Sequence, residues 1–448
     1  MENQRLFSNQ KLWKLIIPLM IEQGLTILVG MADGVMVSSV GEAAISGVSL
    51  VDMINAVILV LFAALATGGA VVTSQFLGAR NWEKARKSAG QLVLMAVGLG
   101  VLTMVPCLIF DEELLMLCFG AIEADVKAAG LKYLQITALS FPFIALYNAG
   151  AAIYRSVGNS KVSMKVSMLM NVINVVGNAF CIFVLKWGVY GVAVPTLVSR
   201  AAAGIYMMIL VAKPDQELSL TREGLTTIDK KMMGSILRIG VPSACENCFF
   251  SLGRLIVASM ITLFGTYQVS ANAVAGNIDR VGIIMGQAMG LAMVTVVGQC
   301  VGARDTDQAV YYIKKLLRWT YLIQGASNVL ILIFISPLVG LYGALSEETR
   351  QLAMQLSTLH AAMGIVFWPV SFVLPNALRA ANDVKFTMWV GIGSMLVCRI
   401  FGSWLLCVHF GLGALGVWIA MITDWVCRTA FFVPRTMKGT WKTKYQPD

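Results

Sequence analysis

The two halves of the chain share a short sequence, which reads SQFLGAR at Ser74–Arg80 and GQCVGAR at Gly298–Arg304, 224 residues later. The same offset aligns further pairs without a gap: Pro18 with Pro242, Glu22 with Glu246, Gly41 with Gly265, Ser46 with Ser270, and Arg155 with Arg379. A single offset that holds over such a length indicates an internal repeat. We therefore predict two similar halves.

Long blocks without charged residues indicate that both halves lie in a membrane. Hydrophobic residues make up 58% of the 448 residues and charged residues only 13%, whereas a soluble domain usually carries about 25% charged residues. Residues 53–79, 88–110, 133–154, 319–346 and 351–378 contain no Asp, Glu, Lys or Arg. Because a helix needs about 20 apolar residues to cross a bilayer, each block predicts a transmembrane helix.

The fold class that follows is an all-α integral membrane protein with twelve transmembrane helices in two parallel-repeat six-helix bundles. The predicted spans are approximately 12–40, 44–78, 88–110, 126–154, 161–185, 188–212, 234–264, 268–302, 309–336, 350–378, 384–409 and 412–434. Six spans per half return the chain to its starting side, so the bundles are related by an axis along the membrane normal. We expect an N-terminal bundle at 1–212, a cytoplasmic linker at 213–231 and a C-terminal bundle at 232–448.

Lys and Arg residues are distributed unevenly between the two sides of these spans. Most lie in one set of connections, whereas the opposite set holds Lys127, Lys132, Lys186 and Arg350. This asymmetry marks the cytoplasmic side. We therefore expect a multi-pass protein of the cell (plasma) membrane with both termini in the cytoplasm. Because the positive charges follow topology, the formal charge of +10 does not indicate nucleic-acid binding.

Two acids in the first span are candidates for chemistry. Glu22 and Asp33 are eleven residues apart, close to three helical turns, and so project from one helix face. An ionisable residue inside a span is costly unless it is paired or wet. A carboxylate at such a depth can exchange a proton or offer oxygens to a cation. The alternative for either acid is a locked ion pair or a helix cap.

The second half repeats only one of these acids. Glu246 corresponds to Glu22, and Val257 occupies the position that corresponds to Asp33. We expect Glu22 and Glu246 to line a substrate cavity, one from each bundle. Arg254 either neutralises one of them or extends toward the membrane surface.

Asparagines on the fifth span form another polar face. Asn171, Asn174 and Asn178 are spaced by three and four residues and so share one side of a helix. Their amides suit a cavity wall or the coordination shell of a cation, and equally suit hydrogen bonds between helices. In the last spans, by contrast, Arg399, Asp424 and Arg428 indicate an ion network that holds the bundle together.

The sequence lacks the motifs that are typical of several functional classes. The chain has no G-x-x-x-x-G-K-[ST] sequence, so we expect no ATP hydrolysis. It has no zinc-type cluster of His, Cys and carboxylates and no G-x-S-x-G elbow. We therefore predict no catalytic residue, no metal site and no cofactor other than H+ or Na+ as a coupling ion.

The ordered motifs together resemble the multidrug and toxic compound extrusion (MATE) family of transporters. They are PLMIEQGLTILVGMADGVMVSSVGEAAISGVSL from Pro18, SQFLGAR and its repeat GQCVGAR, YRSVGNSK with its echo LRAANDVK, and GVYGVAVPT with its echo GALGVWIA. The resemblance covers nearly the whole chain. It implies export of cationic, often aromatic, compounds in exchange for protons or sodium.

The resemblance also implies roles for particular residues. Asp33 matches the first-span acid that couples cations, and Asn174 matches the family's fifth-span asparagine. Asn178 stands where some members have a second acid, and the tenth span has His360 and no acid. Asp33, Asn174 and Asn178 are therefore the expected cation-coupling residues, with small amphipathic molecules, H+ or Na+, and the lipid bilayer as partners. A lipid flippase of the same architecture is the alternative, and an intramembrane enzyme is the least favoured class.

Overall fold

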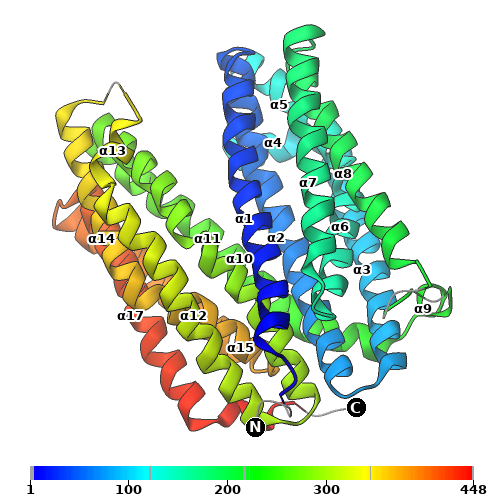
Figure 1. Cartoon of the computed structure of the whole chain (residues 1–448). Helices are drawn as coiled ribbons and strands as arrows, with labels where there is room; N and C mark the ends of the chain where they lie inside the picture. Colours follow the sequence, from blue (N-terminus) through cyan, green and yellow to red (C-terminus); the bar gives the residue numbers. More distant parts are fainter. Residues whose placement is uncertain (1–4, 121–122, 215–217, 221, 344, 446–448) are drawn as a thin grey trace. The chain divides into compact units, whose positions relative to one another are not determined.

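The computed structural model describes residues 5–120, 123–214, 218–220, 222–343 and 345–445, and their regular secondary structure is helical (Figure 1). Eleven helices are long and apolar enough to cross a membrane, or twelve if one bent pair is counted as a span. This confirms the predicted all-α, twelve-span membrane protein. The first half comprises α1 (Asn9–Ser38), α2 (Glu42–Gly78), α3 (Trp82–Ile109), α4 (Asp111–Phe119), α5 (Ala124–Ala138), α6 (Phe141–Ser156), α7 (Ser160–Ala179) with the π-helical η2 (Phe180–Val184), and α8 (Tyr190–Val211).

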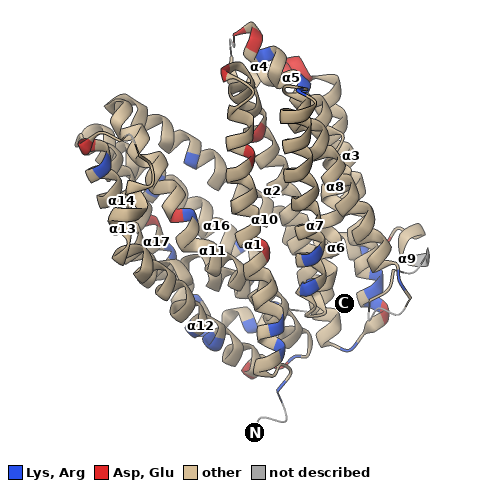
Figure 2. Cartoon of the chain, turned by 45° about the horizontal axis from the view of Figure 1, so that its top comes forward, with Lys and Arg blue, Asp and Glu red and all other residues tan. Residues whose placement is uncertain are grey.

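The linker and the second half also consist of helices. They comprise α9 (Arg222–Thr226), α10 (Lys230–Ile261) with η3 (Thr262–Phe264), α11 (Thr266–Gly302), α12 (Thr306–Ile333), α13 (Ile335–Gly340), α14 (Glu347–Trp368), η4 (Pro369–Val373), α15 (Leu374–Ala380), α16 (Val384–Ser394), η5 (Met395–Phe401), η6 (Trp404–His409), α17 (Gly413–Lys438) and η7 (Thr440–Thr443). Charged residues are sparse along the middle of the long helices and gather toward helix ends, as Figure 2 shows.

The bent pair is α5 and α6, which together form the fourth span. The two helices meet at an angle of 48° across Leu139 and Ser140. Pro142 lies in the first turn of α6, where its missing N–H costs no intrahelical hydrogen bond. The predicted single span 126–154 is therefore broken near its middle.

The motif shared by the two halves forms the same turn twice. Helices α2 and α11 begin and end 224 residues apart, and so do α3 and α12. Arg80 and Arg304 take the left-handed conformation, with φ of 58° and 57°. The side chains of Asn81 and Asp305 then cap the next helix by accepting a hydrogen bond from a backbone N–H in its first turn. The repeat thus encodes a tight helix–turn–helix connection.

The chain divides into two compact units. One consists of Asn9–Ala244, and the other of Cys245–Asp448 together with the segment Met1–Ser8. The division falls inside α10, beyond the linker 213–231 at which the sequence places the boundary. The first part of α10 packs closely on α2, because a Cβ at Gly68 would lie 2.5 Å from the carbonyl oxygen of Ile236. Below, these units are called the N-terminal and C-terminal lobes.

The described part of the linker is fixed to the N-terminal lobe by α3. Gln91 Nε2 donates to the carbonyl oxygens of Gly224 and Thr227 at 3.0 and 2.7 Å, and its Oε1 accepts from Asp229 N at 3.0 Å. Lys87 Nζ lies 2.7 Å from the Asp229 carboxylate. This hydrogen bond, with help from backbone N–H groups, holds the pKa of Asp229 below its usual value. The contact therefore stabilises the docked linker at neutral pH and is lost as the pH falls through that lowered pKa.

Replacing Gln91 with Ala should release this segment. The substitution removes three hydrogen bonds at once, each worth about 1 kcal/mol. Hydrogen–deuterium exchange of the peptide that covers 224–233 should accelerate at least about tenfold, with little change in peptides from α1 or α7. Gln351→Ala, which removes an exposed hydrogen bond to Glu347, is the matched control. Unchanged exchange in the Gln91 variant would show that other contacts fix the linker.

Candidate functional site

Asp33 on α1 meets two amides on α7. Asn178 Nδ2 donates to Asp33 Oδ1 at 2.9 Å. The Asn174 amide is oriented so that its Nδ2 donates to the two carboxylate oxygens at 3.0 and 3.1 Å, while its Oδ1 accepts from Thr196 Oγ1 on α8 at 3.2 Å. The reverse orientation would set two acceptors against each other. The structure thus brings the three residues chosen from the sequence into one cluster and adds Thr196.

A second acid lies close to this cluster. Asp52 on α2 accepts a hydrogen bond from the hydroxyl of Tyr133 at 3.2 Å, and both Asp52 and Arg200 act electrostatically on Asp33. Arg200 in turn donates to Ser140 Oγ at 3.0 Å. The sequence analysis overlooked Asp52, although an acid inside the predicted span 44–78 is itself a signal. This part of the N-terminal lobe holds two carboxylates and one guanidinium.

Asn171 lies two helical turns from Asn178 but does not join the cluster. Its Nδ2 is buried and has no hydrogen-bond partner among the described residues. The amides of Asn174 and Asn178 are buried, whereas Asp33 is half-buried. The role of Asn171 in a substrate cavity stays a prediction.

Glu22 is buried inside the N-terminal lobe and bonded to α6 and α7. Its carboxylate accepts hydrogen bonds from the Tyr147 hydroxyl and from Ser163 Oγ, both at 2.9 Å. Arg155 Nη1 lies 3.7 Å away. These contacts tie α1 to its neighbours, so they give Glu22 a structural role.

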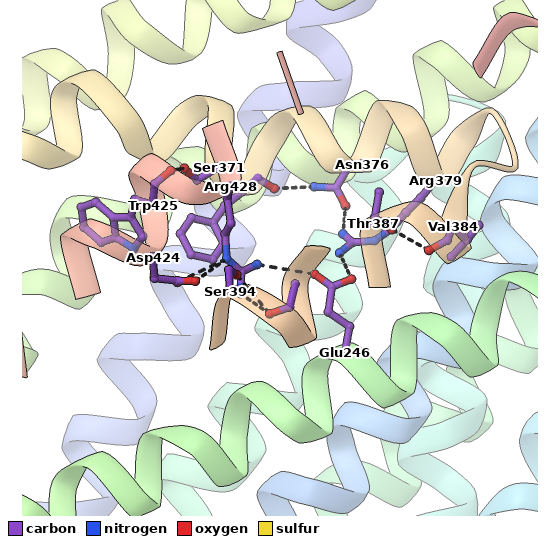
Figure 3. A network of polar contacts seen from close by, with 12 residues as sticks. Glu246, Ser371, Asn376, Arg379, Val384, Thr387, Ser394, Asp424, Trp425 and Arg428 are labelled. Atoms are coloured by element: carbon purple, nitrogen blue, oxygen red, sulfur yellow. Dashed lines mark hydrogen bonds and ion pairs between the residues drawn. The ribbon is translucent and has the colours of Figure 1, made fainter. Parts of the chain in front are cut away.

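Glu246 makes the corresponding contacts in the C-terminal lobe (Figure 3). Arg379 Nη2 lies 2.6 Å from one carboxylate oxygen, and Arg428 Nη1 lies 3.6 Å from the other. Arg379 is the repeat counterpart of Arg155, so the buried Glu–Arg pair occurs once in each lobe. The described contacts do not pair Arg254 with either acid. The expectation that Glu22 and Glu246 line a substrate cavity stays a prediction.

The ion network predicted for the last spans is present in part. Arg428 Nε donates to both oxygens of Asp424, at 3.1 and 3.2 Å, one turn apart on α17. Arg428 also joins Asp424 to Glu246, as Figure 3 shows. Arg399, which we expected to reach Asp424, has no described hydrogen bond to it and lies over the ring of Phe250, 5.3 Å from the centroid.

The C-terminal lobe contains a cavity of about 260 Å³. Asp279 on α11 and His360 on α14 meet in its wall, with Oδ1 and Nε2 2.5 Å apart. The rings of Trp418 and Trp425 lie edge-on to His360, at 5.7 and 4.9 Å between centroids. Asp279 was overlooked in the sequence, although it falls inside the predicted span 268–302. Among the described residues, no three His, Cys, Asp or Glu side chains are grouped as metal ligands.

The MatE family model matches the chain twice, at residues 18–180 and 242–405. The two matches fall on the two repeated halves and together cover more than half of the chain. The chain belongs to the MATE family. Members of this family are membrane transporters rather than enzymes.

Curated relatives extend over nearly the whole of this MATE chain. It is 30% identical to the uncharacterized transporter YisQ of Bacillus subtilis over 426 residues, which cover 93% of this chain and 91% of the relative. It is 26% identical to the probable multidrug resistance protein NorM of Thermotoga maritima over 445 residues, which cover 97% and 93% of the two chains.

Solved MATE structures share the fold. A MATE protein in complex with MaL6 matches with a TM-score of 0.90 at 23% identity, over 97% of both chains. An outward-facing multidrug resistance MATE transporter matches with a TM-score of 0.89 at 23% identity, again over 97% of both chains.

The contacts of Glu246 predict a loss of stability when its charge is removed. Glu246→Gln leaves the partly buried Arg379 and the buried Arg428 without their shared carboxylate, and breaking a buried ion pair costs about 3–5 kcal/mol. We expect a clearly lower unfolding temperature in detergent than for the exposed control Glu348→Gln. If Glu246 instead lines a substrate cavity, the variant should keep its stability and lose affinity for cationic substrates while retaining neutral ones.

Proposed function

We propose that this MATE transporter is a secondary active antiporter that exports amphipathic, chiefly cationic, small molecules in exchange for H+ or Na+. The observation that carries the proposal is the Asp33 carboxylate, which is held by amides rather than by an arginine. Two relatives support drug export, since their names are probable multidrug resistance protein (NorM) and multidrug export protein (MepA).

The amides around Asp33 can stabilise either the ionised carboxylate alone or a cation bound to it. An asparagine side chain presents either N–H donors or an oxygen acceptor after rotation of its amide. With the N–H groups inward, Asn174 and Asn178 stabilise an empty, ionised Asp33. With the oxygens inward, the same amides and the carboxylate form a set of hard oxygen ligands for Na+, and Thr196 Oγ1 can accept a hydrogen bond from the outward N–H group of Asn174.

Proton coupling uses the same cluster differently. A protonated Asp33 would donate from its own hydroxyl to an amide oxygen, again after rotation of one asparagine. The nearby Asp52 and Arg200 set the local field in which the proton is taken up or released. The cluster is therefore compatible with either ion, and the ion is decided by which one drives transport.

Antiport further requires that ion and cargo favour different states of the protein. A ligand shifts a conformational equilibrium only through a difference in its affinity for the two states. Ionised Asp33 carries a negative charge that attracts a cationic cargo, and a bound H+ or Na+ cancels it. The cargo and the ion thus compete for the negative charge of Asp33, even if they do not contact the same atoms.

Asp33→Asn should uncouple transport from the gradient. The amide keeps the size and hydrogen-bonding capacity of the side chain, so we expect normal insertion and folding. In vesicles, an imposed pH or sodium gradient should no longer drive dye efflux above the background of empty vesicles. Asp125→Asn, at an exposed position of α5, is the control and should transport normally. Gradient-driven efflux at the native rate in the Asp33 variant would remove Asp33 from the coupling mechanism.

A flippase for lipid-linked or amphipathic lipid cargo is the alternative function on the same architecture. Proteoliposomes separate the two proposals, because a flippase moves a labelled lipid between leaflets whereas an antiporter accumulates a soluble dye against an ion gradient. The proposals share the membrane location, which we place in the cell membrane with cytoplasmic termini. Neither involves ATP or nucleic acid.

Cysteine labelling tests this orientation. Single cysteines introduced next to Glu112 and Glu348 in a cysteine-free background should react with a membrane-impermeant maleimide added to intact cells. Cysteines next to Lys84 and Lys442 should react only after permeabilisation, because the Lys- and Arg-rich side stays in the cytoplasm. The opposite labelling pattern would invert the topology.

A further inference from the structure

The cavity in the C-terminal lobe carries positive charge that no described ion pair cancels. Glu246 and Asp424 are matched by Arg379 and Arg428 outside it (Figure 3). The charged or ionisable residues that line the cavity are Arg254, Arg399, Asp279 and His360. Even with His360 neutral, two guanidinium groups face one carboxylate. Arg254 is exposed, whereas Arg399 is buried and forms no ion pair among the described residues. A buried charge without such a partner is costly, so the cavity favours an anion near Arg399.

Arg399 is the residue best placed to receive that anion. It is only 8% exposed, and its Nε has no hydrogen-bond partner among the described residues. The π-helical segment η5 carries it, and such segments often occur at functional sites. Asp424 acts favourably on the charge of Arg399, and Arg254, which lines the same cavity, acts unfavourably. A bound carboxylate would relieve the repulsion between the two arginines.

Aromatic side chains form a further part of the lining: Phe250, Trp368, Phe372, Trp418 and Trp425. The rings of Trp368 and Phe372 are stacked, with centroids 5.1 Å apart, and the ring of Trp425 lies 6.3 Å from that of Phe372. Phe250 lies beneath both Arg399 and Arg428. Faces and edges of this kind pack against a flat aromatic ligand. The volume, about 260 Å³, is slightly below the roughly 300–1,000 Å³ found for small-molecule pockets, which indicates a compact ligand.

The internal repeat relates this cavity to the Asp33 cluster. At the offset of 224 residues, Val257 in the cavity wall corresponds to Asp33, and Arg254 corresponds to Gly30. Arg399 corresponds to Val175, next to Asn174. Each of these charged residues therefore has an uncharged counterpart in the other lobe, and the two regions carry excess charge of opposite sign, carboxylate around Asp33 and guanidinium around the cavity.

We propose that the C-terminal cavity is a binding site for a compact aromatic carboxylate, whose anionic group pairs with Arg399 and Arg254 and whose rings pack among Trp368, Phe372 and Trp425. This goes beyond the proposed antiport of cations at Asp33, since it assigns a second site with the opposite charge preference. A zwitterionic compound would meet Asp279 as well, and its amine would compete with His360 for that carboxylate.

Calorimetric titration of the purified full-length protein tests the site without an ion gradient, so its outcome is independent of antiport. Naphthoate is the probe, and naphthamide and naphthylmethylammonium are the neutral and cationic analogues of the same shape. Naphthoate should bind at least about tenfold more tightly than either analogue, as expected for a charge-assisted bidentate pair. Arg399→Gln and Arg254→Gln should each weaken naphthoate binding by about tenfold or more.

Two further variants separate binding from folding. Arg399→Lys keeps the charge without the planar fork and should retain part of the affinity. Arg318→Gln removes an exposed positive charge from α12 outside the cavity lining and should change affinity less than about twofold. Equal affinity for naphthoate and naphthamide would overturn the proposal. So would unchanged naphthoate affinity in both Arg399→Gln and Arg254→Gln, or an equal loss in Arg318→Gln.

Discussion

A charged group inside the bilayer must be paired, hydrogen-bonded or wet, and this constraint accounts for most of the polar architecture of this transporter. Each lobe contains one buried glutamate from its first span, joined to an arginine that the repeat preserves: Glu22 with Arg155 and Glu246 with Arg379. Removing either partner would leave the other charge without this ion pair inside an apolar bundle. These pairs bind helices distant in sequence and give both lobes the same internal frame.

The two lobes differ in the charged residues that form no fixed ion pair. In the N-terminal lobe Asp33 is held by Asn174 and Asn178, whose amides can turn, rather than by a fixed cation. In the C-terminal lobe Arg399 is buried beside a cavity with a donor unused. Groups that the fold leaves without a permanent counter-ion are the ones able to exchange a partner, so binding function is expected there.

The sequence predicted the helices and the repeat well, because twenty-residue apolar blocks and a constant offset are strong local signals. Helical spacing placed Asn174 and Asn178 on one face of their helix, and the family resemblance grouped them with Asp33. The structure brings the three side chains into contact. The partners of Glu22 and Glu246 were missed, because pairing between residues more than a hundred positions apart depends on tertiary packing. The repeat held the clue, as it preserves the arginine together with the glutamate. Asp52 and Asp279 were overlooked although both lie inside predicted spans, whereas the π-helical position of Arg399 required the structure.

Infrared difference spectroscopy tests most directly whether the amide-held acid, and not the paired acids, exchanges its partner. Spectra of the purified protein would be recorded on switching pH and on adding Na+, for the unaltered chain and for Asp33→Asn, Glu22→Gln and Glu246→Gln. The account predicts a carboxyl signal that disappears in Asp33→Asn and persists in both glutamate variants. A signal that persists in Asp33→Asn and disappears in Glu22→Gln or Glu246→Gln would contradict it.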